Sequence, residues 1–297
     1  MGDRLPVFKM NGIGNRIAVV DLRAHLRAGG TPLTEAEART LAGPSRGLGF
    51  DQLMALHPGR DGADVVIAIH NSDGTPAGAC GNGMRCVADV LFAETDADRL
   101  VAETTAGALA MTRGPRPLTY TIDMGPARFG WADVPLAHAV SDTGAVDVPL
   151  GVDDAALLGP AACASMGNPH AVFWVSDPQA IDLARLGPMI ETHPLFPDRV
   201  NVSFVRVDGP DAVTARVWER GAGATLACGS AACAIAALAA RSGRTGPSVR
   251  VSLPGGNLDI EVRPHDGHIL MTGLVETEAV GSIDRDTLTV DLGRAAA

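Results

Sequence analysis

Two cysteines, Cys80 and Cys228, lie 148 positions apart in segments that share one plan. Each segment begins with a run of β-branched apolar residues, which predicts a strand. A polar residue, Asn71 or Glu219, ends each run, and Cys-Gly follows nine residues later. Apolar residues at helical spacing come next, from Met84 in the first copy and over 230–240 in the second. Each copy is therefore predicted to be strand, glycine-rich loop, cysteine and helix.

A thiol at a helix N-terminus lies among unpaired backbone N–H groups at the positive end of the helix dipole. That setting favours the thiolate and lowers a cysteine pKa to roughly 3.5–7.5. The same N–H groups bind carboxylates, and Gly81 and Gly229 leave the approach unobstructed. Although a lone cysteine is more often an ordinary core residue, two matched copies predict two thiols on opposite faces of one small anionic substrate. Racemisation by two bases requires that arrangement.

The remaining cysteines give no sign of a metal site or a disulfide framework. Cys86 and Cys233 fall inside the predicted helices, where a cysteine behaves as a small apolar residue, so we place them in the core. Cys163 has no counterpart, and no Cys-x-x-Cys pair occurs. We therefore predict no metal.

Composition narrows the class of protein. A chain of 297 residues with 46% apolar content predicts two folded domains, and a net charge of −10 argues against binding nucleic acid or an anionic membrane. Neither a signal peptide nor an apolar membrane span is evident, so we expect a cytoplasmic protein whose partner is a small molecule. Lys9 is the only lysine, and no complete nucleotide fingerprint occurs. We expect no cofactor.

The duplication extends beyond the cysteines. Asn15 is echoed by Asn168, and Gln52 by Asn201, at similar offsets. We predict an α/β (α+β) fold of two pseudo-symmetric domains, with residues 127–274 forming the second. The first comprises residues 1–126 and 275–297, because the strand-rich end of the chain is expected to return to it. Thr34 and Glu37 have the spacing of a helix capping box.

Several motifs together resemble the diaminopimelate epimerase family. They are the paired cysteines, Lys9-Met-Asn-Gly-Ile-Gly-Asn15, Gly167-Asn-Pro-His170, Arg199-Val-Asn201-Val and Glu219-Arg-Gly-Ala-Gly, and they span residues 8 to about 273. The resemblance implies cofactor-independent interconversion of LL- and meso-2,6-diaminopimelate, on the route to lysine and peptidoglycan. It also implies a homodimer, with each half a curved mixed sheet around a central helix.

Matched residue by residue, the resemblance implies that Cys80 and Cys228 are the acid/base pair. It assigns the reacting carboxylate to Gly81, Asn82, Gly229 and Ser230. The implied substrate-binding positions are Asn15, Gln52, Asn71, Asn168, Asn201, Glu219 and Arg220. His170 and Glu219 match positions beside the thiols, where either could tune protonation. Arg220 also follows from chemistry, since guanidinium binds a remote carboxylate as a bidentate fork; a structural salt bridge is the alternative.

Four positions depart from the family pattern: Asn11, Arg16 and Ile17 stand where His, Asp and Phe are usual, and Ala224 stands where Glu is usual. Arg16 would bring a cation near Asn15 and could alter substrate choice. A proline, hydroxyproline or histidine racemase with the same two-thiol plan is therefore the alternative enzyme. Two other hypotheses stay open: a covalent cysteine nucleophile, which leaves the second cysteine without a role, and a non-enzymatic protein that binds a dicarboxylic amino acid.

Overall fold

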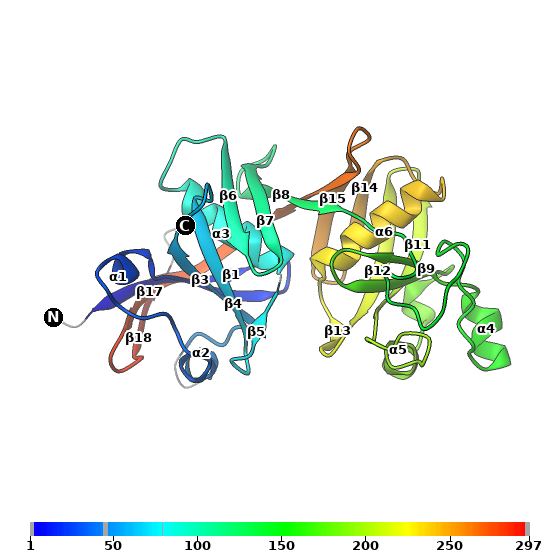
Figure 1. The fold of residues 1–297 in the computed structure, drawn as a ribbon, viewed down its shortest axis with the longest axis horizontal. Coiled ribbons are helices and arrows are strands. Elements are labelled where there is room, and N and C mark those ends of the chain that lie inside the picture. The colour runs from blue at the N-terminus through cyan, green and yellow to red at the C-terminus, as the bar shows by residue number, and fades with distance from the viewer. Residues whose placement is uncertain (1–2, 44–46, 79, 295–297) are drawn as a thin grey trace. The chain divides into compact units, whose positions relative to one another are not determined.

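The structure is a computed structural model that describes residues 3–43, 47–78 and 80–294 (Figure 1). The chain forms two compact units, Met1–Ile122 with Gly273–Ala297, and Asp123–Thr272. Each unit is a mixed sheet with helices, which confirms the predicted fold class. Within the described ranges, no helix is long and apolar enough to cross a membrane.

The first unit contains most of the helices and strands of the N-terminal half and the last two strands of the chain. In chain order they are β1 (Arg4–Asn11), β2 (Arg16–Asp21), α1 (Arg23–Arg27), α2 (Glu35–Ala42), β3 (Gln52–Pro58), β4 (Val65–Asn71), β5 (Pro76–Ala77), α3 (Gly81–Phe92), β6 (Arg99–Thr104), β7 (Gly107–Arg113), β8 (Thr119–Pro126), β17 (Glu276–Asp284) and β18 (Val290–Arg294). Strand β4 and helix α3 confirm the strand and the helix predicted for the first copy.

The second unit repeats this order. Its elements are α4 (Val152–Leu158), β9 (Ala162–Ser165), β10 (Pro169–Trp174), the 3₁₀ turn η2 (Pro178–Ala180), α5 (Leu183–Glu191), β11 (Asn201–Gly209), β12 (Ala212–Glu219), β13 (Gly223–Thr225), α6 (Gly229–Arg241), β14 (Ser248–Leu253), β15 (Gly256–Val262) and β16 (His268–Leu274). Here β12 and α6 confirm the second copy. Strands β8 and β16 carry the chain across the boundaries between the units.

Strand pairing shows that the duplication is structural. In the first unit β2 runs parallel to β3, β3 antiparallel to β4, β4 parallel to β6 and β6 antiparallel to β7. In the second unit the same four relations join β10, β11, β12, β14 and β15 in that order. The first parallel connection of each unit contains a helix, α2 between β2 and β3 and α5 between β10 and β11. Matching residues of the two copies therefore occupy matching places in the two sheets.

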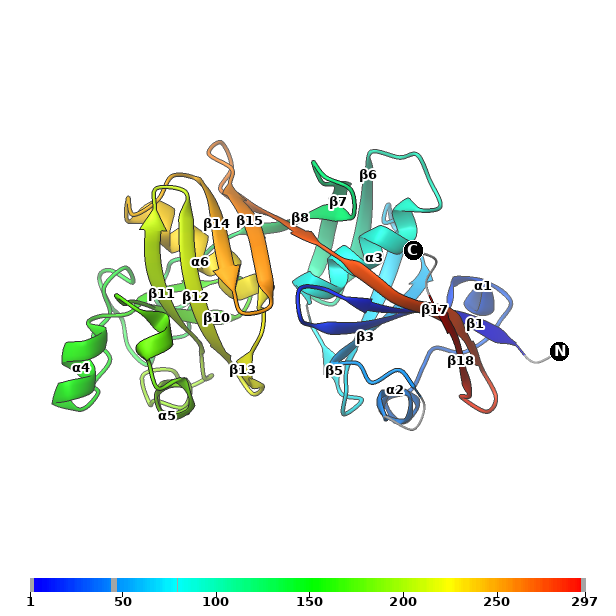
Figure 2. The same ribbon diagram turned by 180° about the vertical axis from the view of Figure 1, so that it is seen from behind.

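Each cysteine is followed by a helix that packs on the sheet. Helix α6 contacts β9, β10, β11, β14 and β15, and it is buried from Ala231 to Ala239. Figures 1 and 2 show it from opposite sides, first in front of these strands and then behind them. Its alanines allow backbone and sheet to approach closely. Cys86 and Cys233, 0% exposed in α3 and α6, are confirmed as core residues.

The opposite face of the second sheet packs on α5. Phe173 and Phe204 stack there with ring centroids 5.7 Å apart, in one cluster with Leu186 and Ile190 of α5. Because side chains alternate along a strand, the residues next to these two phenylalanines point the other way, toward α6. The α6 face therefore carries His170 of β10 and, on β11, the side chain of Asn201.

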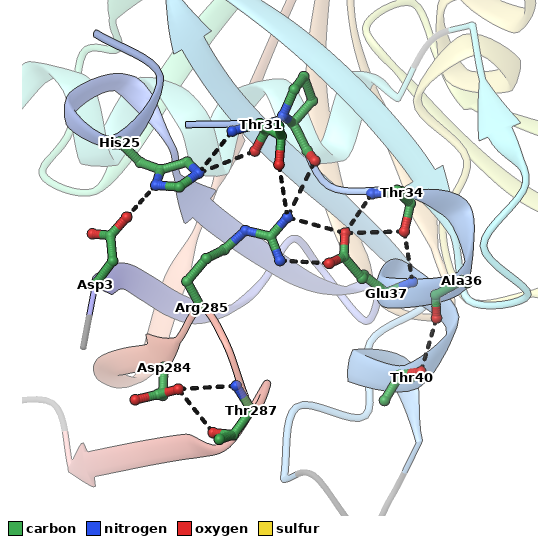
Figure 3. A network of polar contacts seen from close by, with 11 residues as sticks. Asp3, His25, Thr31, Thr34, Ala36, Glu37, Thr40, Asp284, Arg285 and Thr287 are labelled. Atoms are coloured by element: carbon green, nitrogen blue, oxygen red, sulfur yellow. Dashed lines mark hydrogen bonds and ion pairs between the residues drawn. The ribbon is translucent and has the colours of Figure 1, made fainter. Parts of the chain in front are cut away.

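The C-terminal strands return to the first unit, as predicted. Strand β17 pairs antiparallel with β1, and β18 with β17. Figure 3 shows what fixes the turn between them: the Arg285 guanidinium pairs with the Glu37 carboxylate at the start of α2. Glu37 also accepts from the Thr34 backbone N–H at 2.8 Å, which confirms the predicted capping box. This network ties the turn between β17 and β18 to the start of α2.

Candidate active site

The two cysteines of the repeated plan, Cys80 and Cys228, are both N-cap residues. Cys80 precedes α3 with φ −150°, and Cys228 precedes α6 with φ −133°, so both have the extended backbone that a cap requires. The predicted helix N-terminal positions are confirmed. Each thiol is nearly enclosed, at 8% and 4% exposure of the residue. The positive end of the helix dipole and the N–H groups of the first turn therefore lie next to each sulfur.

The Cys80 sulfur is held by the first turn of α3. The backbone N–H of Gly83 donates to Sγ at 3.2 Å. Gly83 also makes room for the thiol, because a Cβ there would lie 3.1 Å from Sγ and 2.6 Å from Sδ of Met54. A donated N–H stabilises the negatively charged form of an acceptor. The Gly83 N–H would therefore stabilise a thiolate formed at Cys80.

The bend between β1 and β2 lies against this turn. Gly14 N donates to Asn11 Oδ1 at 2.7 Å, and Gly12 N to Asn15 O at 2.9 Å. A Cβ on Gly12 would lie 3.2 Å from Cβ of Asn82, so glycine permits the approach. Asn15 Oδ1 is buried and has no hydrogen-bond partner among the residues described. The bend that carries this unpartnered amide oxygen thus approaches Asn82, the second residue of α3, through Gly12.

The other two predicted residues of this unit, Gln52 and Asn71, pair with each other. They are register partners on β3 and β4, and Gln52 Nε2 donates to Asn71 Oδ1 at 3.2 Å. Asn71 Nδ2 in turn donates to Thr75 Oγ1 at 3.1 Å. Both amides are therefore oriented by the sheet.

Arg16 and Ala224, two of the departures from the family pattern, change little at the site. Arg16 forms an ion pair with Asp51 at 2.6 Å, so a carboxylate balances the charge of the cation that was expected near Asn15. Ala224 of β13 is exposed and is the register partner of Trp218 of β12. Because neighbouring residues of a strand point to opposite faces, Ala224 lies on the face of Trp218 and not on the face of Glu219. The missing Glu side chain would not have pointed at Cys228.

In the second unit a chain of polar contacts leads to Cys228. Sγ lies 3.5 Å from Oγ of Ser230, which accepts from Asn168 Nδ2 at 3.3 Å. Asn168 Oδ1 is 2.9 Å from His170 Nε2, which must be the donor because Oδ1 can only accept. His170 therefore reaches the thiol through two other side chains. Burial and the Arg220 charge lower the pKa of His170 to about 3, so its imidazole is neutral.

Cys228 differs from the sequence-based expectation of a low thiol pKa. Burial raises its pKa well above the ordinary value, and the Glu219 carboxylate, hydrogen-bonded to the thiol, raises it further. The Ser230 hydroxyl and the Ala231 N–H act in the opposite direction without overcoming these two effects. The expectation was wrong here because a helix N-terminus predicted from sequence does not show how completely the thiol will be buried, and burial is the largest cause of the raised pKa. These effects together favour the neutral thiol at Cys228.

Arg220 is held by its backbone and presents an open side chain. Its N–H donates to Asn201 Oδ1 at 3.0 Å, while Asn201 Nδ2 donates to Pro169 O at 2.9 Å. The guanidinium donates to Asp198 O at 3.0 Å and, within the described chain, pairs with no carboxylate. The alternative of a structural salt bridge is therefore unsupported.

The structure thus groups the candidate residues by unit. The first unit brings together Cys80, Gly81, Asn82 and the Asn15 bend, and separately pairs Gln52 with Asn71. The second brings together Cys228, Gly229, Ser230, Asn168, His170 and Glu219, and joins Asn201 to Arg220. Sequence reasoning missed Glu191, which contacts Gly221 beside Arg220. No local signal could have revealed it, because its partner lies 30 positions away in the chain.

Solved structures with this fold define a class of two-unit α/β proteins. A phenazine biosynthesis PhzF-family protein from Enterococcus faecalis aligns with a TM-score of 0.65 at 17% identity, over 94% of this chain and 99% of that one. A hydroxyproline epimerase from Agrobacterium vitis aligns with a TM-score of 0.65 at 18% identity, over 96% and 94%. At such identities the likeness establishes the fold alone.

Sequence comparison identifies the family within that class. The diaminopimelate epimerase family model matches residues 7–130 and 162–278. A diaminopimelate epimerase from Afipia carboxidovorans is 50% identical over 279 residues, which cover 94% of each chain. This chain belongs to the diaminopimelate epimerase family.

Proposed function

We propose that this protein interconverts LL- and meso-2,6-diaminopimelate by exchanging an α-proton between Cys80 and Cys228. The observation that carries the proposal is the matched position of the two thiols, each the N-cap of the helix that follows the fifth strand of its unit, β5 or β13. Family membership supplies the substrate. The reaction would be a step in the formation of lysine and peptidoglycan precursors.

The proposed reaction moves one proton at each face of the α-carbon. One sulfur, as thiolate, takes the α-proton, and the C–H electron pair stays on the carbon. The opposite thiol then gives its proton to that carbon, so the two sulfurs exchange protonation states. In the resting protein the Gly83 N–H favours Cys80 as the base, while burial and Glu219 keep Cys228 protonated as the acid. In the reverse direction the roles of the two sulfurs are interchanged. No cofactor is needed.

The reacting carboxylate is proposed to bind at the first turns of the two helices, at Gly81, Asn82, Gly229 and Ser230. Backbone N–H groups there stabilise a carboxylate as negative charge develops on it. Asn15 fits a complementary role, because its buried, unpartnered Oδ1 would accept from the substrate ammonium group.

The unreacting end of diaminopimelate carries a second amino group and a second carboxylate. We assign it to Gln52, Asn71, Asn168, Asn201, Glu219 and Arg220. Support comes from the Arg220 guanidinium, which has no carboxylate partner in the described part of the chain and matches a carboxylate in shape and charge. Asn201 fixes the backbone that carries it.

We further propose that the two compact units correspond to the two epimerase halves, which the sequence places at residues 1–126 with 275–297 and at residues 127–274, a few residues from the boundaries of the units. A cytoplasmic homodimer is proposed from family resemblance. Sedimentation equilibrium of the purified chain tests the assembly: a mass near twice 30.5 kDa is expected, and a monomer at assay concentration would contradict it.

Proton NMR of LL-diaminopimelate with reduced protein in D2O tests the reaction. Deuterium should enter the α-carbon as the meso isomer forms, while proline, hydroxyproline and histidine in parallel tubes stay unchanged. Exchange of another amino acid alone would keep the two-thiol mechanism and reject the substrate. Tight binding without exchange would favour the binding-protein hypothesis.

Substitutions then test the two thiols. Cys80→Ala and Cys228→Ala should each abolish epimerisation, because one remaining sulfur cannot both remove and return the proton. Cys163→Ala is the matched control, since Cys163 is equally buried but packs in the α5 core. Full turnover by either of the first two variants would rule out the two-base mechanism.

A further inference from the structure

Glu191, the last residue of α5, is a buried carboxylate that belongs to none of the sites described above. It is 5% exposed. Its Oε2 accepts from the indole Nε1 of Trp218 at 2.7 Å, and its Oε1 accepts from the Gly221 backbone N–H at 2.8 Å. The Arg199 guanidinium lies 3.6 Å from Oε1. Two hydrogen-bond donors from the β12–β13 segment and the Arg199 cation thus meet on one carboxylate.

The location of Glu191 is not explained by its own helix. A carboxylate at a helix C-terminus lies at the negative end of the dipole, which is unfavourable. Burial adds a further cost unless the charge is hydrogen-bonded. Its two close hydrogen bonds both go to the turn between β12 and β13 and the strand before it. The compensation therefore comes from that turn.

The Trp218 side chain also packs against the turn between β12 and β13. A Cβ on Gly187, one helical turn before Glu191, would lie 2.4 Å from Cδ2 of the indole, so the ring lies directly on α5 at this glycine. On its other side, the ring would be 3.6 Å from a Cβ on Gly223. The indole is thus packed between α5 and the turn, with its N–H on Glu191.

The supported turn carries two proposed active-site residues. Glu219 is hydrogen-bonded to the Cys228 thiol, and Arg220 is proposed to bind the remote carboxylate. Gly221 and Gly223 have φ of +77° and +83°, a region that glycine enters freely. Because these glycines leave the backbone permissive, its conformation depends on anchoring hydrogen bonds. Glu191 supplies one of them next to Arg220.

We propose that Glu191, together with Trp218, is a positioning residue that sets the Glu219–Gly223 turn and so aims Arg220 at the substrate. The proposal rests on the proposed function for its substrate but not for its structural part. Glu191 lies on the α5 face of the sheet, whereas Glu219 and Cys228 lie on the α6 face. It therefore acts through the turn and not by contact with substrate.

Glu191→Gln is the test, because glutamine has one acceptor and one donor where glutamate has two acceptors. One of the two N–H groups, of Trp218 or Gly221, would then face an amide NH2. We expect KM for diaminopimelate to rise about tenfold, or roughly 1.4 kcal/mol, with kcat changed less than threefold. A merely structural role would lower kcat or the active fraction and leave KM unchanged, and that result would overturn the proposal.

A double variant keeps the test meaningful if Glu191→Gln is poorly folded. In Glu191→Gln with Trp218→Phe, the indole N–H is gone and the glutamine oxygen is available to Gly221. We expect KM to recover to within threefold of wild type, a better result than the two single effects combined. Failure to recover would count against the proposal. Glu103→Gln, which removes a carboxylate paired with Arg60, is the control for loss of charge alone.

Hydrogen exchange of the peptide spanning residues 216–226 gives a readout that needs no turnover. Exchange should be faster in Glu191→Gln and slower again in the double variant. If the wild-type protein failed to epimerise diaminopimelate, the proposed function would fall, yet this exchange would still decide whether Glu191 holds the turn. Unchanged exchange in Glu191→Gln would overturn the positioning role whatever the substrate.

Discussion

Replacing Gly83 by alanine tests how the first turn of α3 holds the Cys80 thiol. The added Cβ would lie 2.6 Å from Met54 Sδ and 3.1 Å from Cys80 Sγ. Because an ordinary contact is about 3.5–4.0 Å, the sulfur of Cys80 must retreat by roughly 0.5 Å. The Met54 side chain has flexible torsions and absorbs most of the other overlap.

The expected magnitudes follow from these displacements. Overpacking costs about 1–3 kcal/mol, and alanine in place of glycine in a helix returns at most about 1 kcal/mol. We therefore expect a loss of about 0–2 kcal/mol in the free energy of unfolding. Since a misplacement of about 1 Å can cost roughly 100-fold in rate, kcat/KM should fall about tenfold. The loss of activity should exceed what the loss of folded protein explains.

Urea unfolding and deuterium exchange at the α-carbon measure the two quantities. Gly78→Ala is the control, because its Cβ would meet only Thr105 Oγ1, at 3.9 Å. Adding Met54→Val to Gly83→Ala removes the thioether overlap and leaves the sulfur displaced. Activity close to wild type in Gly83→Ala would refute the reasoning, and recovery on adding Met54→Val would show that Met54, not the thiol, caused the loss.

Three further predictions concern titration. Glu219→Gln should lower the pKa of Cys228, because a carboxylate that opposes the thiolate is removed. Peptide mass spectrometry of Cys228 alkylation against pH measures this pKa, and an unchanged pH midpoint would contradict the effect of Glu219. The pKa of His170 is about 3 in the folded protein and about 6.5 in the unfolded chain. Between these values only the unfolded chain binds the proton, so the free energy of unfolding should fall by about 1.4 kcal/mol for each unit by which pH decreases. Unfolding of His170→Gln at pH 7 and pH 5 should lack this share of the slope, and an identical slope would contradict it. Although burial opposes ionisation of Glu37, hydrogen bonds from Arg285 and Thr34 lower its pKa, so its stabilisation is present at neutral pH and lost as pH falls through the folded value. Glu37→Gln should therefore cost about 1 kcal/mol at pH 7, given solvent screening, and the gap from wild type should close in acid.

Much of the fold was predictable because the signals are local. The strands before each cysteine and the helices after it follow from residues adjacent in the chain, and the capping box at Thr34 needs only its own helix. The repeat offset made the second unit predictable from the first. The return of β17 to β1 was expected from composition, but its pairing register was not.

The candidate site was predictable as a set of residues, and less so as an electrostatic environment. Repeat spacing and motifs singled out Cys80 and Cys228 as helix caps, yet the expected low pKa failed at Cys228. That thiol's protonation depends on how completely the sheet encloses it and on Glu219 across the β13 turn. Arg16 likewise needed Asp51, 35 positions away, before its charge could be judged.

By itself, the sequence determined the duplicated plan, the capping cysteines, the class of chemistry and the family motifs, because each depends on residue type and spacing along the chain. Tertiary structure alone decided which side chains meet: His170 linked to Cys228 through Asn168 and Ser230, Arg220 left without a carboxylate among the described residues, and Glu191 placed under the turn that carries it. Burial and charge pairing arise between distant segments, so only the folded sheet and helices fix them.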